Sequence, residues 1–153
     1  MSETDPPAEP LARATTRRRD LGEAMTDLEK VVAGPASADG WLDRVDMSLV
    51  GLRGALDGHI EEVEGPGGLL AEIAAVAPRL AAYTEDLRQE HVALLGAWLR
   101  TEATVRAASG DLPAAVSAVR RRVTTLLGRL TMHRQAGSDL VFEAYNVDIG
   151  AMD

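Results

Sequence analysis

The sequence predicts an all-α protein, an up-down-up-down four-helix bundle. Apolar residues recur at alternating steps of three and four along four long stretches of the chain. Breaks rich in glycine and proline separate these stretches, and none of them alternates in the manner of a strand. Long amphipathic segments joined by short breaks are typical of antiparallel bundles, in which each helix buries one apolar stripe.

The chain of 153 residues is expected to form one bundle domain between two short tails. Residues 1–9 are acidic and proline-rich and predict a disordered N-terminal tail. Residues 10–146 form the expected bundle, and residues 147–153 form a C-terminal tail. Only 3% of the residues are aromatic, so the core is expected to consist mainly of leucine, valine and alanine.

The first helix is expected over residues 11–32, and Gly34 and Pro35 end it. The triplet Arg17–Arg19 lies close to acidic residues and is interpreted as part of a solvated helix face. Four apolar residues mark the buried stripe of this helix: Leu21, Met25, Leu28 and Val32.

Ser37 and Asp39 are candidate N-caps for the second helix, which ends at the break Gly65–Gly68. Residues 69–76 follow as a short apolar helical segment. The stripe of the second helix contains one histidine among apolar residues: Leu42, Val45, Leu49, Leu52, Leu56, His59 and Val63.

The third helix is expected over residues 79–108, with Pro78 in its first turn. Its inward residues are expected to be Leu80, Tyr83, Leu87, His91, Leu94, Trp98 and Val105. Asp111 and Pro113 begin the fourth helix, which runs to about residue 145. Its stripe is Val116, Val119, Val123, Leu126, Leu130, His133, Gly137, Leu140 and Ala144. Trp41 and Trp98 are interpreted as core packing.

Charge and composition exclude several classes of function. A net charge of −8 argues against nucleic acid as a partner. The chain has no cysteine, and no apolar run approaches the length of a membrane span. The N-terminus does not resemble a signal peptide, so we expect a cytoplasmic protein, and arginine-rich usage suggests a bacterial genome. The chain lacks a phosphate-binding glycine loop and the strand context of a serine nucleophile, so we assign no catalytic residues.

Each of the last three long helices carries one histidine in its buried stripe. If the last two helices form an antiparallel hairpin, His91 lies within about 4.5 Å, along the axis, of the level of His133. His59 reaches the same level if residues 69–74 continue the second helix, and misses it by several turns if the chain reverses at Gly65–Gly68.

Three imidazoles that converge in a bundle would suit zinc, iron or copper. Glu62, one turn after His59, is a candidate additional ligand or hydrogen-bond partner. Glu90, next to His91, is expected to face a neighbouring helix or solvent. The alternative is three separate core histidines, each with its own hydrogen bond.

Three short motifs resemble the hemerythrin-like family. They are GHIEEVE at 58–64, RQEHVALL at 88–95 and MHRQAGSDL at 132–140. The resemblance implies a four-helix bundle with a non-haem di-iron centre held by five histidines and two carboxylates. It further implies dioxygen binding, sensing, iron handling, or defence against nitric oxide and peroxide.

Only His59, His91 and His133 match the ligands of that family. Val63, Leu95 and Ser138 stand where it has further ligands, no histidine precedes His59, and Glu62 and Asp139 are one residue out of register. Three hypotheses stay open: a di-iron centre, a mononuclear iron or zinc site on the three histidines with or without Glu62, and a metal-free helical scaffold or protein-interaction module.

The segment Leu140–Ile149, with sequence LVFEAYNVDI, is too apolar for a free tail. We expect it to pack across one end of the bundle, and docking of a protein partner is the alternative. The oligomeric state stays open.

Overall fold

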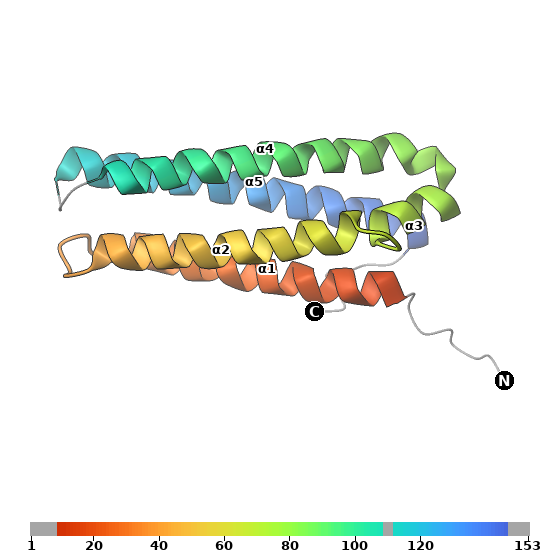
Figure 1. The fold of residues 1–153 in the computed structure, drawn as a ribbon, viewed down its shortest axis with the longest axis horizontal. Helices are drawn as coiled ribbons and strands as arrows, with labels where there is room; N and C mark the ends of the chain where they lie inside the picture. Colours follow the sequence, from red (N-terminus) through yellow and green to blue (C-terminus); the bar gives the residue numbers. More distant parts are fainter. Residues whose placement is uncertain (1–8, 109–111, 147–153) are drawn as a thin grey trace.

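The computed structural model describes residues 9–108 and 112–146, and over these residues the expected all-α fold is confirmed (Figure 1). The four long helices are α1 (Glu9–Ala33), α2 (Trp41–Glu64), α4 (Ala81–Ala107) and α5 (Pro113–Tyr145). A short helix α3 (Leu69–Val76) and a 3-10 turn η1 (Pro78–Leu80) connect α2 to α4. Residues 1–8 and 147–153 of the two expected tails, and the expected cap Asp111, lie outside the described residues, while Glu9 already belongs to α1.

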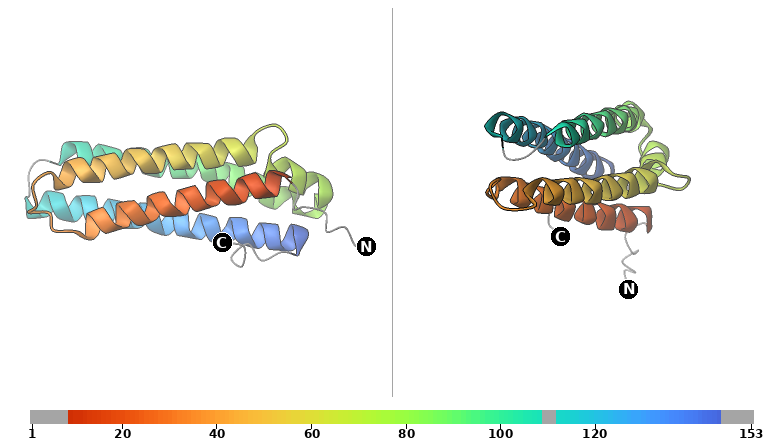
Figure 2. Two further views of the ribbon diagram at one scale, coloured as in Figure 1. Left: turned by 90° about the horizontal axis from the view of Figure 1, so that it is seen from below. Right: turned by 60° about the vertical axis from the view of Figure 1, so that its left-hand side comes forward.

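The four long helices lie side by side, and both views of Figure 2 agree on this arrangement. The connection between α1 and α2 lies at one end of the molecule, whereas α3 and η1 lie at the other end (Figure 1). There α3 contacts α1, α2, α4 and α5, so it closes that end of the assembly. Within the described part of the chain, no helix is both long enough and apolar enough to cross a membrane.

The buried stripes form two hydrophobic clusters. On three helices a histidine separates the residues of one cluster from those of the other. The larger cluster fills most of the bundle and includes Leu21, Leu28, Leu49, Leu52, Leu56, Leu94, Trp98, Val123, Leu126 and Leu130. The smaller cluster, called the end cluster here, comprises Leu11, Ala14, Val63, Leu69, Leu70, Ile73, Ala77, Leu80, Leu87, Leu140 and Val141.

The expected N-caps of the second helix are wrong. Helix α2 begins at Trp41 after Gly40, and no side chain caps it. Gly40 has φ of 77°, which glycine adopts without strain, and this conformation turns the chain into the helix. The buried Trp41 also donates a hydrogen bond from Nε1 to the carbonyl oxygen of Val31, at 3.0 Å. The start of α2 is therefore fixed by a turn and a tryptophan rather than by a capping side chain.

The expected inward position of Tyr83 is wrong as well. Its side chain is 62% exposed, and the buried residue is its neighbour Thr84. Residues three and four before Leu87 both fit the stripe, so spacing alone does not choose between them. The hydroxyl group of Thr84 donates to the carbonyl oxygen of Ala81 at 2.7 Å, so the threonine can be buried with its hydrogen bond satisfied.

Two other expectations are confirmed for the residues that the structure describes. Trp41 and Trp98 are buried, and Trp98 Nε1 donates to the carbonyl oxygen of Leu49 at 2.8 Å. The beginning of the C-terminal apolar segment packs at the closed end, where Leu140 and Val141 belong to the end cluster. This segment continues α5 as far as Tyr145.

Candidate metal centre

The three histidines come from three different helices and meet at the boundary between the two core clusters. Helix α2 ends at Glu64, five residues after His59, whereas α4 begins at Ala81, ten residues before His91. Helix α3 and η1 occupy the end of the bundle between these two points. The condition that residues 69–74 must extend the second helix was therefore wrong, because a separate crossing helix brings the two histidines to one level.

The imidazole nitrogens of the trio point at one another. His133 Nε2 lies 3.1 Å from His91 Nε2 and 3.3 Å from His59 Nε2. One ligand atom from each histidine lies within 4.8 Å of the other two. Two nitrogens bound to one zinc ion at about 2.0–2.1 Å, in tetrahedral geometry, are about 3.4 Å apart. The three histidines are thus close enough to hold one metal ion.

Burial keeps the imidazoles neutral. The side chains of His91 and His133 are 2% and 3% exposed, and His59 is partly buried. Burial, reinforced by His133, lowers the pKa of His59 to about 4 and that of His91 to about 3. Burial also lowers the pKa of His133, although the carboxylate of Glu90 acts in the opposite direction. Neutral imidazole is the form that can bind a metal ion.

The outer nitrogens of two histidines face carboxylates. Glu64 Oε1 lies 3.4 Å from His91 Nδ1, and Glu90 Oε1 lies 3.1 Å from His133 Nδ1. Neither contact has the alignment of a hydrogen bond, and among the described residues all three Nδ1 atoms are buried without an aligned partner. Burial raises the pKa of Glu64. Of the two expected positions of Glu90, the structure shows the one that faces a neighbouring helix, since its carboxylate reaches the histidine of α5.

The protons of the trio cannot all be placed well without an ion. His133 Nε2 can accept hydrogen bonds from the Nε2–H groups of His59 and His91, but then the Nδ1 atoms of these two residues carry no proton. His91 Nδ1 would then present its lone pair to the carboxylate of Glu64. A bound ion removes this conflict, because each Nε2 faces the metal and each Nδ1 carries a proton.

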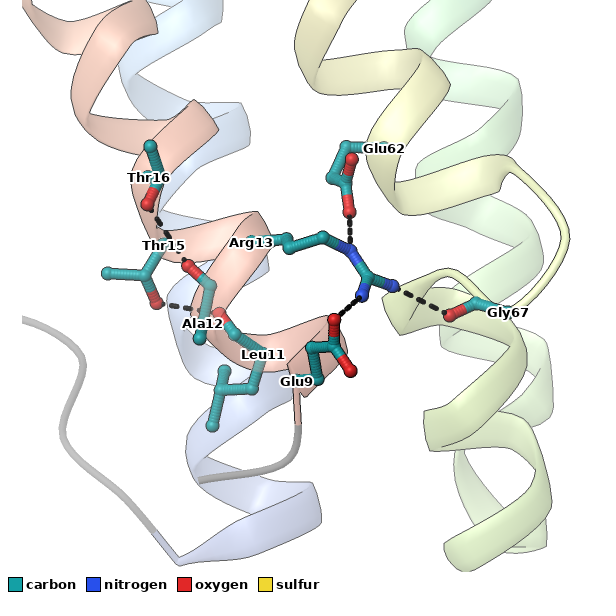
Figure 3. Close-up of polar contacts among 8 residues, drawn as sticks. All are labelled: Glu9, Leu11, Ala12, Arg13, Thr15, Thr16, Glu62 and Gly67. Carbon is teal, nitrogen blue, oxygen red and sulfur yellow. Dashed lines mark hydrogen bonds and ion pairs between the residues drawn. The ribbon is translucent and has the colours of Figure 1, made fainter. Parts of the chain in front are cut away.

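Glu62, the fourth expected ligand, faces a different partner. Its carboxylate accepts a hydrogen bond from the guanidinium group of Arg13 on α1, which also pairs with Glu9 and donates to the carbonyl oxygen of Gly67 (Figure 3). Among the described residues, the group able to hold a metal consists of the three histidines alone. The three histidines thus lie together, whereas Glu62 forms an ion pair that joins α2 to α1.

The positions where the hemerythrin-like pattern has further ligands hold other groups. Val63 is buried in the end cluster, and Leu95 packs against the larger cluster. Ser138 donates its hydroxyl to the carbonyl oxygen of Arg134 at 3.0 Å, and Asp139 accepts from Gln135 at 2.9 Å. The donor set therefore fits one ion and does not fit two.

A cavity of about 50 Å³ adjoins the trio on the side of the end cluster. Such a volume can hold water-sized molecules. Arg18 is among the lining residues and is partly buried, so the expectation that the whole triplet Arg17–Arg19 lies on a solvated face is wrong for this residue. The cavity lining is mostly apolar: Ala14, Val63, Leu69, Leu70, Ile73, Leu87, Leu140 and Val141, with Thr15, Arg18, Arg134, Gly137 and the three histidines.

Sequence reasoning missed Glu64 and Arg18 as neighbours of the trio. Glu64 is the last residue of α2 and directly precedes the glycine-rich turn, where a helix end can face the next helix. This position before a glycine-rich turn is the sequence feature that could have identified Glu64. Comparison of the chain with family models, curated proteins and solved structures found no match.

Proposed function

We propose that this protein is a hemerythrin-like, up-down-up-down helical bundle that binds a single zinc or non-haem iron ion through His59, His91 and His133. The observation that carries the proposal is the convergence of three neutral imidazoles, with Nε2 separations of 3.1 and 3.3 Å around His133. The orphaned Nδ1 atoms add support, because coordination through Nε2 gives each of them a proton.

The proposed role is to bind or sense a small molecule rather than to stabilise the fold alone. Three protein ligands leave a coordination position open, which is typical of reactive metal sites, whereas structural zinc sites have four. The cavity of about 50 Å³ beside the trio offers space for a small molecule at that position. This combination supports a sensing role for small gases or oxidants.

A metal-free scaffold is the second candidate. The same Nε2 contacts at 3.1 and 3.3 Å can serve as hydrogen bonds among core histidines. The 3.1 Å approach of Glu90 to His133 would then hold the central imidazole in place without an ion. In this case the protein would act through its surface and not through the trio.

Elemental analysis separates the two candidates. The protein is purified without a histidine tag, loaded with Zn(II) or anaerobically with Fe(II), and freed of loosely bound ions. We expect about one equivalent of metal per chain. Less than about 0.2 equivalents of any transition metal would contradict the proposal and favour the scaffold.

The variant His91→Ala tests whether the trio is the site. Zinc at 100 times its Kd is expected to stabilise the wild-type protein by about 2.7 kcal/mol, and this gain should vanish in the variant. Gln89→Ala, at an exposed position on the same helix, serves as the control and should keep the gain. Melting temperatures are measured with zinc and with EDTA. If the variant lowers the melting temperature equally with zinc and with EDTA, His91 has a packing role only.

A further inference from the structure

Two glutamates occupy equivalent places around the histidine trio. Each glutamate faces a histidine that lies on the next long helix of the chain. Glu64 on α2 faces His91 on α4, and Glu90 on α4 faces His133 on α5. Side-chain exposures of 29% for Glu64 and 35% for Glu90 place the two carboxylates between the buried imidazoles and the surface.

Coordination of an ion would fix the protonation of the outer nitrogens. An imidazole that binds a metal through Nε2 carries its proton on Nδ1, and a buried N–H group needs an acceptor. For His91 and His133 the described carboxylates at that position are those of Glu64, at 3.4 Å, and Glu90, at 3.1 Å. Alignment of both contacts would come with the ion, since such hydrogen bonds are often long or poorly directed in a site without its ligand.

Charge also favours this arrangement. Three neutral imidazoles and a divalent ion carry a charge of +2, which is costly away from water. The two carboxylates at the outer nitrogens offset this charge, against the guanidinium groups of Arg18, Arg88 and Arg134, which lower the pKa values of the nearby imidazoles. Negative charge close to the ion would therefore come from Glu64 and Glu90.

We infer that Glu64 and Glu90 are positioning residues of the proposed metal site, which accept hydrogen bonds from the Nδ1–H groups of His91 and His133 and offset the charge of a divalent ion. The inference rests on the proposed function. It assigns unequal roles to the ligands, because a carboxylate lies 3.4 Å from Nδ1 of His91 and 3.1 Å from Nδ1 of His133, whereas among the described residues no carboxylate pairs with His59. His91 and His133 are thus oriented from outside the trio, and His59 is not oriented in this way.

Zinc affinity of three glutamine variants tests the inference. Glutamine keeps the size of glutamate and removes its charge. We expect Glu64→Gln and Glu90→Gln each to weaken Zn(II) binding by roughly 10- to 100-fold. Glu62→Gln is the matched control, since Glu62 lies on α2 close to Glu64 but pairs with Arg13, and it should bind zinc as the wild type does. Dissociation constants are measured by competition with a chromophoric chelator.

The outcomes distinguish this inference from the proposed function. A wild-type protein that binds neither Zn(II) nor Fe(II) overturns both. Wild-type zinc binding with unchanged affinity in Glu64→Gln and Glu90→Gln overturns the inference alone. Melting temperatures in EDTA show whether each variant folds; if Glu90→Gln does not, Glu64→Gln at the helix end decides the result.

The ratio of Zn(II) to Cu(I) affinity separates a charge effect from a general loss of structure. A lost negative charge weakens binding of a divalent ion more than that of a monovalent ion. We therefore expect the ratio to fall in Glu64→Gln and Glu90→Gln and to stay constant in Glu62→Gln. Equal losses of affinity for both ions would overturn the assignment of a charge role to the two carboxylates.

Discussion

At the scale of single residues, the trio shows how burial sets the chemistry of histidine. Each imidazole replaces an apolar residue in a buried stripe, and burial lowers the pKa of all three. The same burial leaves the outer nitrogens dependent on the few polar groups within reach. Neutral, crowded imidazoles of this kind are ready to bind a metal without first losing protons.

The lowered pKa values predict an acid-sensitive fold in the metal-free protein. His59 and His91 have pKa values of about 4 and about 3 in the folded state, against 6.5 for an unperturbed histidine. Between these limits the unfolded chain binds more protons than the folded chain. The free energy of unfolding therefore falls as the pH drops below about 6.5, and it does not depend on these histidines above that pH. Each histidine contributes up to about 1.4 kcal/mol per pH unit.

Urea unfolding in EDTA at pH 7, 6 and 5 measures this dependence. His91→Leu removes one of the titrating groups and keeps an apolar side chain in the stripe. Its stability should therefore decline less steeply with acid than that of the wild type. A decline of equal slope in the two proteins would show that His91 does not carry the effect.

At the scale of elements, glycines set where the second helix starts and ends. Gly40 has φ of 77° before α2, and a Cβ at Gly65, directly after α2, would lie 2.6 Å from the carbonyl oxygen of Glu61. Gly54 is different, because it lies in the middle of α2 on the exposed face, and a Cβ there would meet no atom within 4 Å. The first two glycines are required by the backbone, whereas the third is not.

Alanine substitutions at two glycines are expected to act in opposite directions. Gly40→Ala should destabilise the protein by about 1 kcal/mol, because alanine is strained at positive φ. Gly54→Ala should stabilise it by about 0.5–1 kcal/mol, because alanine favours the helix and restricts the unfolded chain. Urea unfolding at pH 7 measures both. Stabilisation by Gly40→Ala would contradict the left-handed turn before α2.

At the scale of the whole molecule, the histidine layer divides one bundle into two packed parts. The larger cluster joins the four long helices, whereas the end cluster depends on α3 for Leu69, Leu70 and Ile73. Helix α3 has only eight residues and would not be stable alone. Its apolar side chains hold it in place and at the same time line the cavity beside the trio.

The variant Ile73→Ala tests the contribution of the end cluster to global stability. Ile73 is fully buried, so its truncation should cost about 2–5 kcal/mol. Val76→Ala on the same helix removes a side chain that is 58% exposed and should change stability by less than about 0.5 kcal/mol. Chemical denaturation of both variants gives the comparison. Equal small effects would mean that α3 packs only loosely.

The sequence predicts most of the fold because each stripe is regular. The steps from Val45 to Val63 and from Val116 to Leu140 identify buried faces directly. The level of His59 against His91 was harder to predict, because it depends on how α3 crosses the end of the bundle. Local spacing does not encode the direction of a short helix between two turns.

The same difficulty explains why Glu64 was not selected from the sequence. Glu62 and Glu64 are two residues apart on α2, and side chains at that separation point in different directions. Which of them faces the trio depends on the position of α4 and on the competing ion pair of Glu62 with Arg13. The histidines could be selected from the sequence because an imidazole in an apolar stripe is unusual, whereas a glutamate at the edge of a stripe is common.

The short crossing helix has a consequence for how quickly a bound ion could exchange. Helix α3 is flanked by the turn at 65–68 and by η1, and none of its residues belongs to the larger cluster, so a local opening of α3 would leave that cluster intact. The cavity beside the trio would then open to water at that end. Ion release would follow the local opening of eight residues rather than the unfolding of the bundle, which would make the site labile even in a stable protein.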